Sequence, residues 1–156
     1  MSGAILRPAR VSDLSTILSV EAACRSVSWS HDNFLLELSD ENALCLIAQT
    51  DEREVCGYIL SRCAADECTI HTLGVLPTCR RQGVGTALVL AHAEAAVRRN
   101  VATLFLEVRA QNTGARVFYA TCGFARCGTR KAYYADDNDD AIIMTRVLAR
   151  PLNLST

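Results

Sequence analysis

The stretch Arg80-Arg81-Gln82-Gly83-Val84-Gly85-Thr86-Ala87 lies between a β-branched, apolar segment that ends at Pro77 and an alanine-rich segment that favours a helix. We therefore expect a strand, a glycine loop and the first turn of a helix. At such a junction, unpaired backbone N–H groups and the positive end of the helix dipole attract an anion. Gly83 and Gly85 would let the anion approach the backbone closely. The pattern predicts a phosphate-binding loop, with a plain turn and helix start as the alternative.

Two common phosphate-binding motifs do not fit this loop. The G-x-x-x-x-G-K-[ST] spacing of a Walker A loop is absent, and no third glycine completes a dinucleotide-binding fingerprint. The loop therefore belongs to another class of anion site.

The remaining sequence predicts one α/β domain over residues 1–156, with a core at about residues 4–148 and a mixed sheet. The expected order of elements is β-α-α-β-β-β-α-β-α-β-β. Strands are expected at residues 4–7, 44–48, 55–63, 68–76, 104–110, 124–130 and 141–147, and helices at 12–25, around Phe34, at 83–99 and at 112–122. A buried stripe is expected on the first helix, formed by Leu14, Ile17, Leu18 and Ala22, and one face of the helix at 83–99 is expected to carry Val84, Leu88, Ala91 and Ala95.

Composition excludes several classes of function. The net charge of −1 argues against bulk binding to nucleic acid or to a membrane surface, and no apolar run is long enough to span a bilayer. The eight cysteines form no C-x-x-C pair, and only three histidines are present, so we expect reduced structural thiols and no metal site. The start, Met1 to Ala4, carries no secretory signal, and we expect a cytoplasmic protein.

Two further segments give the glycine loop a context. They read LFLEVRAQN over residues 104–112 and VFYATCGF over residues 117–124. Together with Arg80 to Gly85 they resemble the signature of the GCN5-related N-acetyltransferases (GNAT). Lys131-Ala132-Tyr133-Tyr134 and the run Asp140 to Met144 narrow the resemblance to the RimI-like protein N-terminal acetyltransferases. The resemblance extends from about Leu6 to Val147.

This resemblance implies a mostly antiparallel sheet in which two central parallel strands, ending near Val75 and Val108, splay apart around acetyl-CoA as cosubstrate. The backbone of Leu73, Gly74 and Val75 would pair with the pantetheine arm. The resemblance implies that the pyrophosphate is held by the backbone amides of Gln82, Gly83, Val84, Gly85 and Thr86. Arg80 and Arg81 would add positive charge, unless they form a solvated pair. Asn112 would contact the arm, or serve only as a helix N-cap.

Acetyl transfer needs a neutral amine, a donor for the tetrahedral oxyanion and a proton for the leaving thiolate. About a tenth of an α-amine with a pKa of about 7.7–8.0 is already neutral at pH 7, so a modest base suffices. Glu107 is the candidate base, working through a water. Its apolar strand would desolvate the carboxylate and raise its pKa. The alternative is an outward-facing glutamate paired with a basic neighbour, and the match to RimI-like enzymes favours the base.

Tyr119 is the candidate general acid for the CoA thiolate by the same match, with a buried core tyrosine as the alternative. The oxyanion donor is expected to be a backbone amide near Val75. His71 would face the acceptor and could assist proton removal. No cysteine has a base at a recognisable offset, so we expect direct transfer in a ternary complex.

Two segments would grip the acceptor: the loop with Val27, Ser28 and Trp29, and the pair Tyr133 and Tyr134. Family members often carry an aromatic residue and a proline where Val27 and Ser28 stand, so the preferred first residue stays open. The acidic run at residues 136–140 is either a solvated turn or an attraction for basic substrate residues.

The expected activity is acetylation of a protein N-terminal α-amine, with the ribosome or a ribosomal protein as candidate partner. The alternatives are a lysine side chain or small amine as acceptor, and a non-catalytic acyl-CoA-binding subunit.

Overall fold

The computed structural model describes residues 4–24, 30–134, 136 and 138–148. Within them, the strands are β1 (Ile5–Pro8), β2 (Ala43–Gln49), β3 (Val55–Ala64), β4 (Glu67–Val75), β5 (Thr103–Arg109), β6 (Ala125–Arg130) and β7 (Ala141–Val147). The helices are α1 (Leu14–Cys24), α2 (His31–Ser39), α3 (Val84–Arg98) and α4 (Thr113–Thr121), with short 3₁₀ turns at Val11–Asp13 and Pro77–Cys79. This order confirms the predicted one, and no helix among the described residues is long and apolar enough to cross a membrane.

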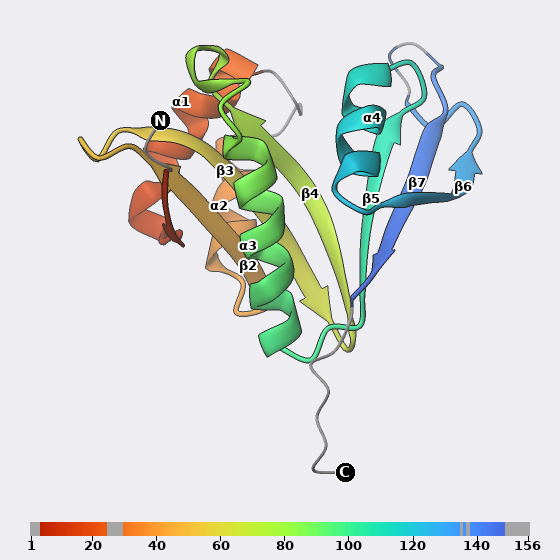
Figure 1. The fold of residues 1–156 in the computed structure, drawn as a ribbon, viewed down its shortest axis with the longest axis horizontal. Helices are drawn as coiled ribbons and strands as arrows, with labels where there is room; N and C mark the ends of the chain where they lie inside the picture. The colour runs from red at the N-terminus through yellow and green to blue at the C-terminus, as the bar shows by residue number, and fades with distance from the viewer. Residues whose placement is uncertain (1–3, 25–29, 135, 137, 149–156) are drawn as a thin grey trace.

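The strands form one sheet in the order β1-β2-β3-β4-β5-β7-β6, in which only β4 and β5 are parallel. Their pairing is short, running from Glu67 opposite Thr103 to Ile70 opposite Leu106. Beyond Ile70, β4 continues to Val75 and β5 continues to Arg109 as two diverging arms (Figure 1). The expected splay between the central strands is confirmed.

A β-bulge at His71 accompanies the splay. Leu60 pairs with Thr72 and Ser61 pairs with Ile70, which leaves His71 as an extra residue on β4. A bulge bends its strand and shifts the alternation of side chains. Ile70 and Leu73 accordingly both face the core under α3, whereas Thr72 faces the α1 side. The strand bends away from β5 where pairing between the two strands stops.

Helices cover both faces of the sheet (Figure 1). The larger core lies between the sheet and helices α3 and α4, and a smaller core around Phe34 and Tyr58 lies under α1 and α2. The buried stripe predicted for α1 was wrong in part, whereas for α3 only a shared face was predicted. On α3, Ala91 and Ala95 are only half-buried, and the buried residues are Val84, Leu88, Val89, His92, Ala93 and Ala96. On α1, Leu18 is half-buried and Ala22 is exposed, and the buried residues are Leu14, Ile17, Val20 and Glu21.

Candidate active site

The glycine loop has the backbone that was predicted for it. Gly83 caps the N-terminus of α3 with φ +80°, and Arg81 also has a positive φ of +62°. Among the described atoms, none lies within 4 Å of a Cβ built on Gly83, so the conformation rather than crowding favours glycine here. A left-handed residue followed by a right-handed one, as Gly83 is followed by the first residue of α3, turns successive N–H groups the same way, which suits an anion.

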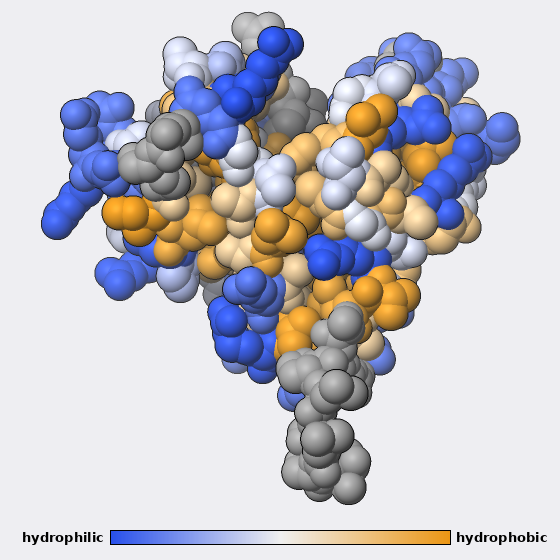
Figure 2. All heavy atoms as spheres, viewed as in Figure 1, coloured by the Kyte–Doolittle hydropathy of each residue, from blue (hydrophilic) through white to orange (hydrophobic). Residues whose placement is uncertain are grey.

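Gly85 lies at a close approach between three elements. A Cβ on Gly85 would lie 3.2 Å from Phe118 Cζ on α4 and 3.8 Å from Val75 Cγ2 on β4. The first turn of α3 therefore packs between the end of β4 and helix α4. Figure 2 shows the molecule hollowed at its upper edge, between the half with α3 and β1 to β4 and the half with α4 and β5 to β7. Apolar side chains lie below the hollow.

The end of β4 forms one wall of this gap with its backbone. Leu76 N donates to Cys56 O at 2.9 Å, and pairing in an antiparallel ladder alternates from residue to residue. The amide groups of Leu73 and Val75 therefore point away from β3 and toward the β5 side. The Val75 carbonyl accepts from Arg80 Nε at 3.0 Å and from Cys24 Sγ at 3.2 Å. An extended ligand could pair with this edge as an added strand would.

The polar residues predicted around the cosubstrate have local roles. Arg80 is tied back to β4 through Val75, and Arg81 and Gln82 are exposed beside it. Thr86 is exposed on the next turn. The Asn112 side chain accepts from Ala115 N at 3.1 Å, which confirms it as the N-cap of α4. A contact between Asn112 and a cosubstrate stays a prediction.

Tyr119 is half-buried on α4 among aromatic rings. Its ring centroid lies 5.1 Å from that of Phe118 and 5.7 Å from that of Phe124, both edge-on. Burial, with a smaller contribution from Cys122, raises the pKa of the Tyr119 phenol. The phenol therefore stays protonated at neutral pH and is available as a hydrogen-bond donor.

Glu107 faces the opposite side of β5 from the α3–α4 core. The neighbours Leu106 and Val108 are buried, but the Glu107 side chain is 28% exposed and its Oε1 lies 3.4 Å from Arg130 Nε. The expectation of a carboxylate enclosed by its apolar strand was wrong, and the structure shows the arrangement given as the alternative, an outward-facing glutamate beside a basic neighbour. Alternation along the strand turns Glu107 away from the apolar core, and β6 supplies a cation beside it. An accessible carboxylate is nevertheless what a base that works through water requires.

His71, at the bulge, shares the face of Glu107. It is half-buried, and burial lowers its pKa; Glu37 and Glu107 oppose this shift and Arg62 adds to it. Glu37 and Arg62 form an ion pair with an O–N distance of 3.4 Å. Side chains from α2, β3, β4 and β5 therefore meet on the face that α1 and α2 cover.

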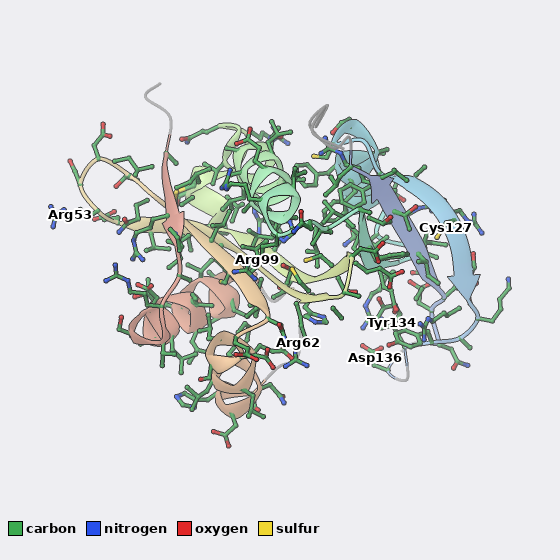
Figure 3. The ribbon with its side chains drawn as sticks, turned by 90° about the horizontal axis from the view of Figure 1, so that it is seen from below. Arg53, Arg62, Arg99, Cys127, Tyr134 and Asp136 are labelled. Atoms are coloured by element: carbon green, nitrogen blue, oxygen red, sulfur yellow. The ribbon has the colours of Figure 1, made fainter. Side chains whose placement is uncertain are left out.

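Tyr133 and Tyr134 lie on this same face. Their ring centroids are 5.1 Å apart, and the Arg109 guanidinium lies 4.0 Å from the centre of the Tyr134 ring. Arg109 also donates to both carboxylate oxygens of Asp136, at 3.1 and 3.0 Å. Figure 3 shows Tyr134 and Asp136 on the same side of the sheet as α1 and α2. The structure thus brings the predicted tyrosines to the face of Glu107.

The acidic turn is held by local partners. Asp139 accepts from Gln111 N at 3.1 Å, and Asp140 accepts from Ala132 N at 2.7 Å. The remaining predicted acceptor residues, Val27, Ser28 and Trp29, lie outside the described residues.

The glycine loop, the splayed parallel strands and the tyrosine-bearing helix that follows define one class of enzyme. The chain belongs to the acetyltransferase (GNAT) family, whose sequence model matches residues 14–124, and it is an acetyl-CoA-dependent N-acetyltransferase.

Among its relatives, [ribosomal protein bS18]-alanine N-acetyltransferase of Escherichia coli K12 is 33% identical over 135 residues, which cover 85% of this chain and 89% of that protein. The crystal structure of the ribosomal-protein-S18-alanine N-acetyltransferase from Escherichia coli superimposes with a TM-score of 0.87 at 29% identity, over 98% of this chain and 99% of that chain. An N-alpha-acetyltransferase of Sulfurisphaera tokodaii is 29% identical over 156 residues, which cover 92% of each protein.

Sequence reasoning missed two features of the site. The bulge at His71 has no residue signature, because any residue can occupy it. The buried bond between Tyr58 and Glu21 was also missed, although a tyrosine inside the apolar run of β3 was a signal for a buried polar partner.

Proposed function

We propose that this protein transfers the acetyl group of acetyl-CoA to the N-terminal α-amine of a protein or peptide, by direct attack in a ternary complex. The observation that carries the proposal is the gap between β4 and β5 beyond Ile70. In this proposal, the glycine loop of α3 lies at one side of the point where pairing stops, and the face that holds Glu107 and Tyr134 lies at the other. Two substrates can therefore approach the same point from opposite sides of the sheet.

The cosubstrate side of the gap suits the shape and charge of acetyl-CoA. The outward amides of Leu73 and Val75 would pair with the pantetheine arm, and the turn of Gln82 to Thr86 would hold the pyrophosphate. Arg81 would add positive charge at the loop, and Asn112 would contact the arm from α4. The close approach at Gly85 supports this placement, because a side chain there would fill the gap.

The reaction then follows from three positions. Glu107 accepts a proton from the α-ammonium through a water, with neutral His71 beside it as an accessory acceptor. The amine nitrogen bonds to the acetyl carbon, and the Val75 amide donates to the oxyanion. As the carbon–sulfur bond breaks, the protonated phenol of Tyr119 donates to the CoA thiolate.

The basicity of the two amines also favours an α-amine over a lysine side chain as acceptor. Well under a thousandth of a lysine amine with a pKa of about 10.4 is neutral at pH 7, so its acetylation needs a stronger base than an α-amine does. The half-buried Glu107 carboxylate beside Arg130 is suited to removing a proton from the less basic α-amine. Tyr133, Tyr134 and the loop at residues 27–29 would grip the first residues of the chain. The relatives point to an alanine at the N-terminus of a ribosomal protein as the first acceptor to test.

The test measures thiol release from acetyl-CoA with short peptides that begin with Ala, Ser, Met or Gly. Matched peptides carry a blocked N-terminus and a free lysine. We expect turnover only on free α-amines, with alanine preferred. Turnover confined to blocked, lysine-bearing peptides would refute the proposal. Absence of turnover, with acetyl-CoA still raising the unfolding temperature, would favour a small-molecule acceptor or a binding subunit.

A further inference from the structure

A buried polar cluster on the α1 side of the sheet has no part in the proposed chemistry. Glu21 is 6% exposed, Tyr58 is 0% exposed and Thr72 is 5% exposed. The Tyr58 hydroxyl donates to Glu21 Oε1 at 2.6 Å and lies 3.0 Å from Thr72 Oγ1. Because a phenol has a single hydrogen, the Thr72 hydroxyl is the donor in the second bond. A buried carboxylate is costly unless it is well bonded, so this arrangement needs a reason.

The cluster joins the last turns of α1 to the splayed part of β4. Glu21 and Cys24 lie on α1, and Cys24 Sγ contacts the Val75 carbonyl at 3.2 Å. A Cβ on Gly74 would lie 2.8 Å from Tyr58 Cε1 and 3.4 Å from Cys24 Sγ. The end of α1 thus packs directly on the part of β4 that has left β5.

Backbone pairing with β3 holds β4 in place without help from the buried polar cluster. Tyr58 is opposite Gly74, and Leu60 is opposite Thr72, in the ladder between β3 and β4. Helix α1 has no such ladder. Its position relative to β4 therefore depends on side-chain contacts, of which the bond from Tyr58 to Glu21 is the shortest among those described here.

We propose that Tyr58, acting with Glu21 and Thr72, is a positioning residue for the acceptor. It sets the distance between the end of α1, which lies on the face where the acceptor is placed, and the stretch of β4 from Thr72 to Val75. This inference rests on the proposed function, since it assigns an acceptor to one side of the joint and acetyl-CoA to the other.

The test compares Tyr58→Phe with Ser61→Ala. Ser61 also lies on β3 and is also fully buried. Its hydroxyl donates to Leu44 O at 2.9 Å and lies 2.6 Å from Nε2 of His92 on α3, on the side away from α1. Both variants lose one buried hydroxyl. We expect Tyr58→Phe to raise the KM for the peptide about fivefold, the size of one net hydrogen bond, and to leave the KM for acetyl-CoA within about twofold. Ser61→Ala should leave both constants within about twofold.

Two further variants sharpen the comparison. Glu21→Gln keeps an oxygen that accepts from Tyr58 and should preserve the peptide KM, because the bond rather than the charge positions α1. Thr72→Val removes the third partner and should raise the peptide KM as Tyr58→Phe does; it also serves where Tyr58→Phe does not fold. Equal effects of Tyr58→Phe and Ser61→Ala, or a joint rise of both KM values, would overturn the inference.

Hydrogen exchange keeps this test separate from that of the proposed function. The amides of residues 20–24 should exchange faster in Tyr58→Phe than in the wild type, and at the wild-type rate in Ser61→Ala. If exchange at residues 20–24 is unchanged in Tyr58→Phe, then Tyr58 does not hold α1 against β4, whatever the acceptor is. The wild-type protein could acetylate no peptide while the exchange difference is present. That result would refute both the proposed function and the assignment of the acceptor. The contact between α1 and β4 would then have a structural role only.

Discussion

Replacing Gly85 with alanine separates two roles that this residue has in the structure. Gly85 is the second residue of α3, where alanine is favoured over glycine by about 0.5–1 kcal/mol. The added methyl group would lie 3.2 Å from Phe118 Cζ and 3.4 Å from Cε1. Ordinary carbon contacts are about 3.5–4.0 Å, so the Phe118 ring must move by a few tenths of an ångström. The ring is only half-buried and can move.

The expected stability change is therefore between about 0 and 1 kcal/mol in favour of the variant. For a chain of this size, 1 kcal/mol corresponds to a rise in unfolding temperature of about 2–4 °C. The same methyl group would enter the gap between Phe118 and Val75, where the cosubstrate arm is placed. We expect Gly85→Ala to raise the KM for acetyl-CoA about tenfold, which is 1.4 kcal/mol of binding.

Gly114→Ala is the matched control. Gly114 is the second residue of α4, and among the described atoms none lies within 4 Å of a Cβ built there. The Gly114→Ala variant should gain the same free energy of unfolding from the helix preference of alanine, and its kinetic constants should be unchanged. The assay combines thermal unfolding with initial rates of thiol release, with acetyl-CoA varied at saturating peptide. A folded Gly85→Ala variant whose KM for acetyl-CoA stays within about twofold of wild type would refute the placement of the arm.

Three further predictions test the reaction and the core. Glu107→Gln should lower kcat/KM at pH 7 by about tenfold to a hundredfold, and the deficit should shrink toward pH 9 because a neutral amine needs no base; a deficit independent of pH would contradict the role of Glu107. Tyr119→Phe should lower kcat by a similar factor at unchanged KM for acetyl-CoA, and an unchanged kcat would exclude Tyr119 as the donor. Burial lowers the pKa of His92 to about 4, whereas an unfolded imidazole binds its proton near pH 6.5. The unfolded state therefore binds more protons between these two pH values, and the free energy of unfolding should fall by about 3 kcal/mol from pH 7 to pH 4. Denaturant titrations should show a weaker fall for His92→Gln but not for the exposed His31→Gln; equal falls in both would assign the pH dependence to other groups.

The order of elements was predictable because its signals are local. The hairpin turn at residues 50–54 and the N-cap at Asn112 need only neighbouring residues, and both are where they were predicted. Family resemblance added what local signals lack, namely the parallel pairing of β4 and β5. Which face of α3 is buried could not be read from the sequence, because alanines do not distinguish one helix face from the next: Ala93 and Ala96 are buried, whereas Ala91 and Ala95 are only half-buried.

The environments of the carboxylates were not predictable in the same way. Glu107 was expected to be desolvated because its neighbours in the chain are apolar, but its side chain is 28% exposed and lies beside Arg130 of β6. Glu21 is a carboxylate that the fold does bury, and its partner Tyr58 lies 37 residues away. In both cases the deciding residue comes from a distant strand, which a local pattern does not contain.

The splay of β4 explains why the two substrates should be separable in experiment. The stretch from Thr72 to Val75 has α3 and α4 on one face, where Gly85 approaches Val75, and α1 on the other, where Tyr58 contacts Gly74. If this stretch is a fixed partition, Gly85→Ala should change only the KM for acetyl-CoA and Tyr58→Phe only the KM for the peptide. The double variant should then show both effects undiminished, because sites without shared partners act additively. If the KM changes in the double variant differ from those of the two single variants combined, then β4 moves as a unit. Binding of one substrate would then affect binding of the other through the strand between them.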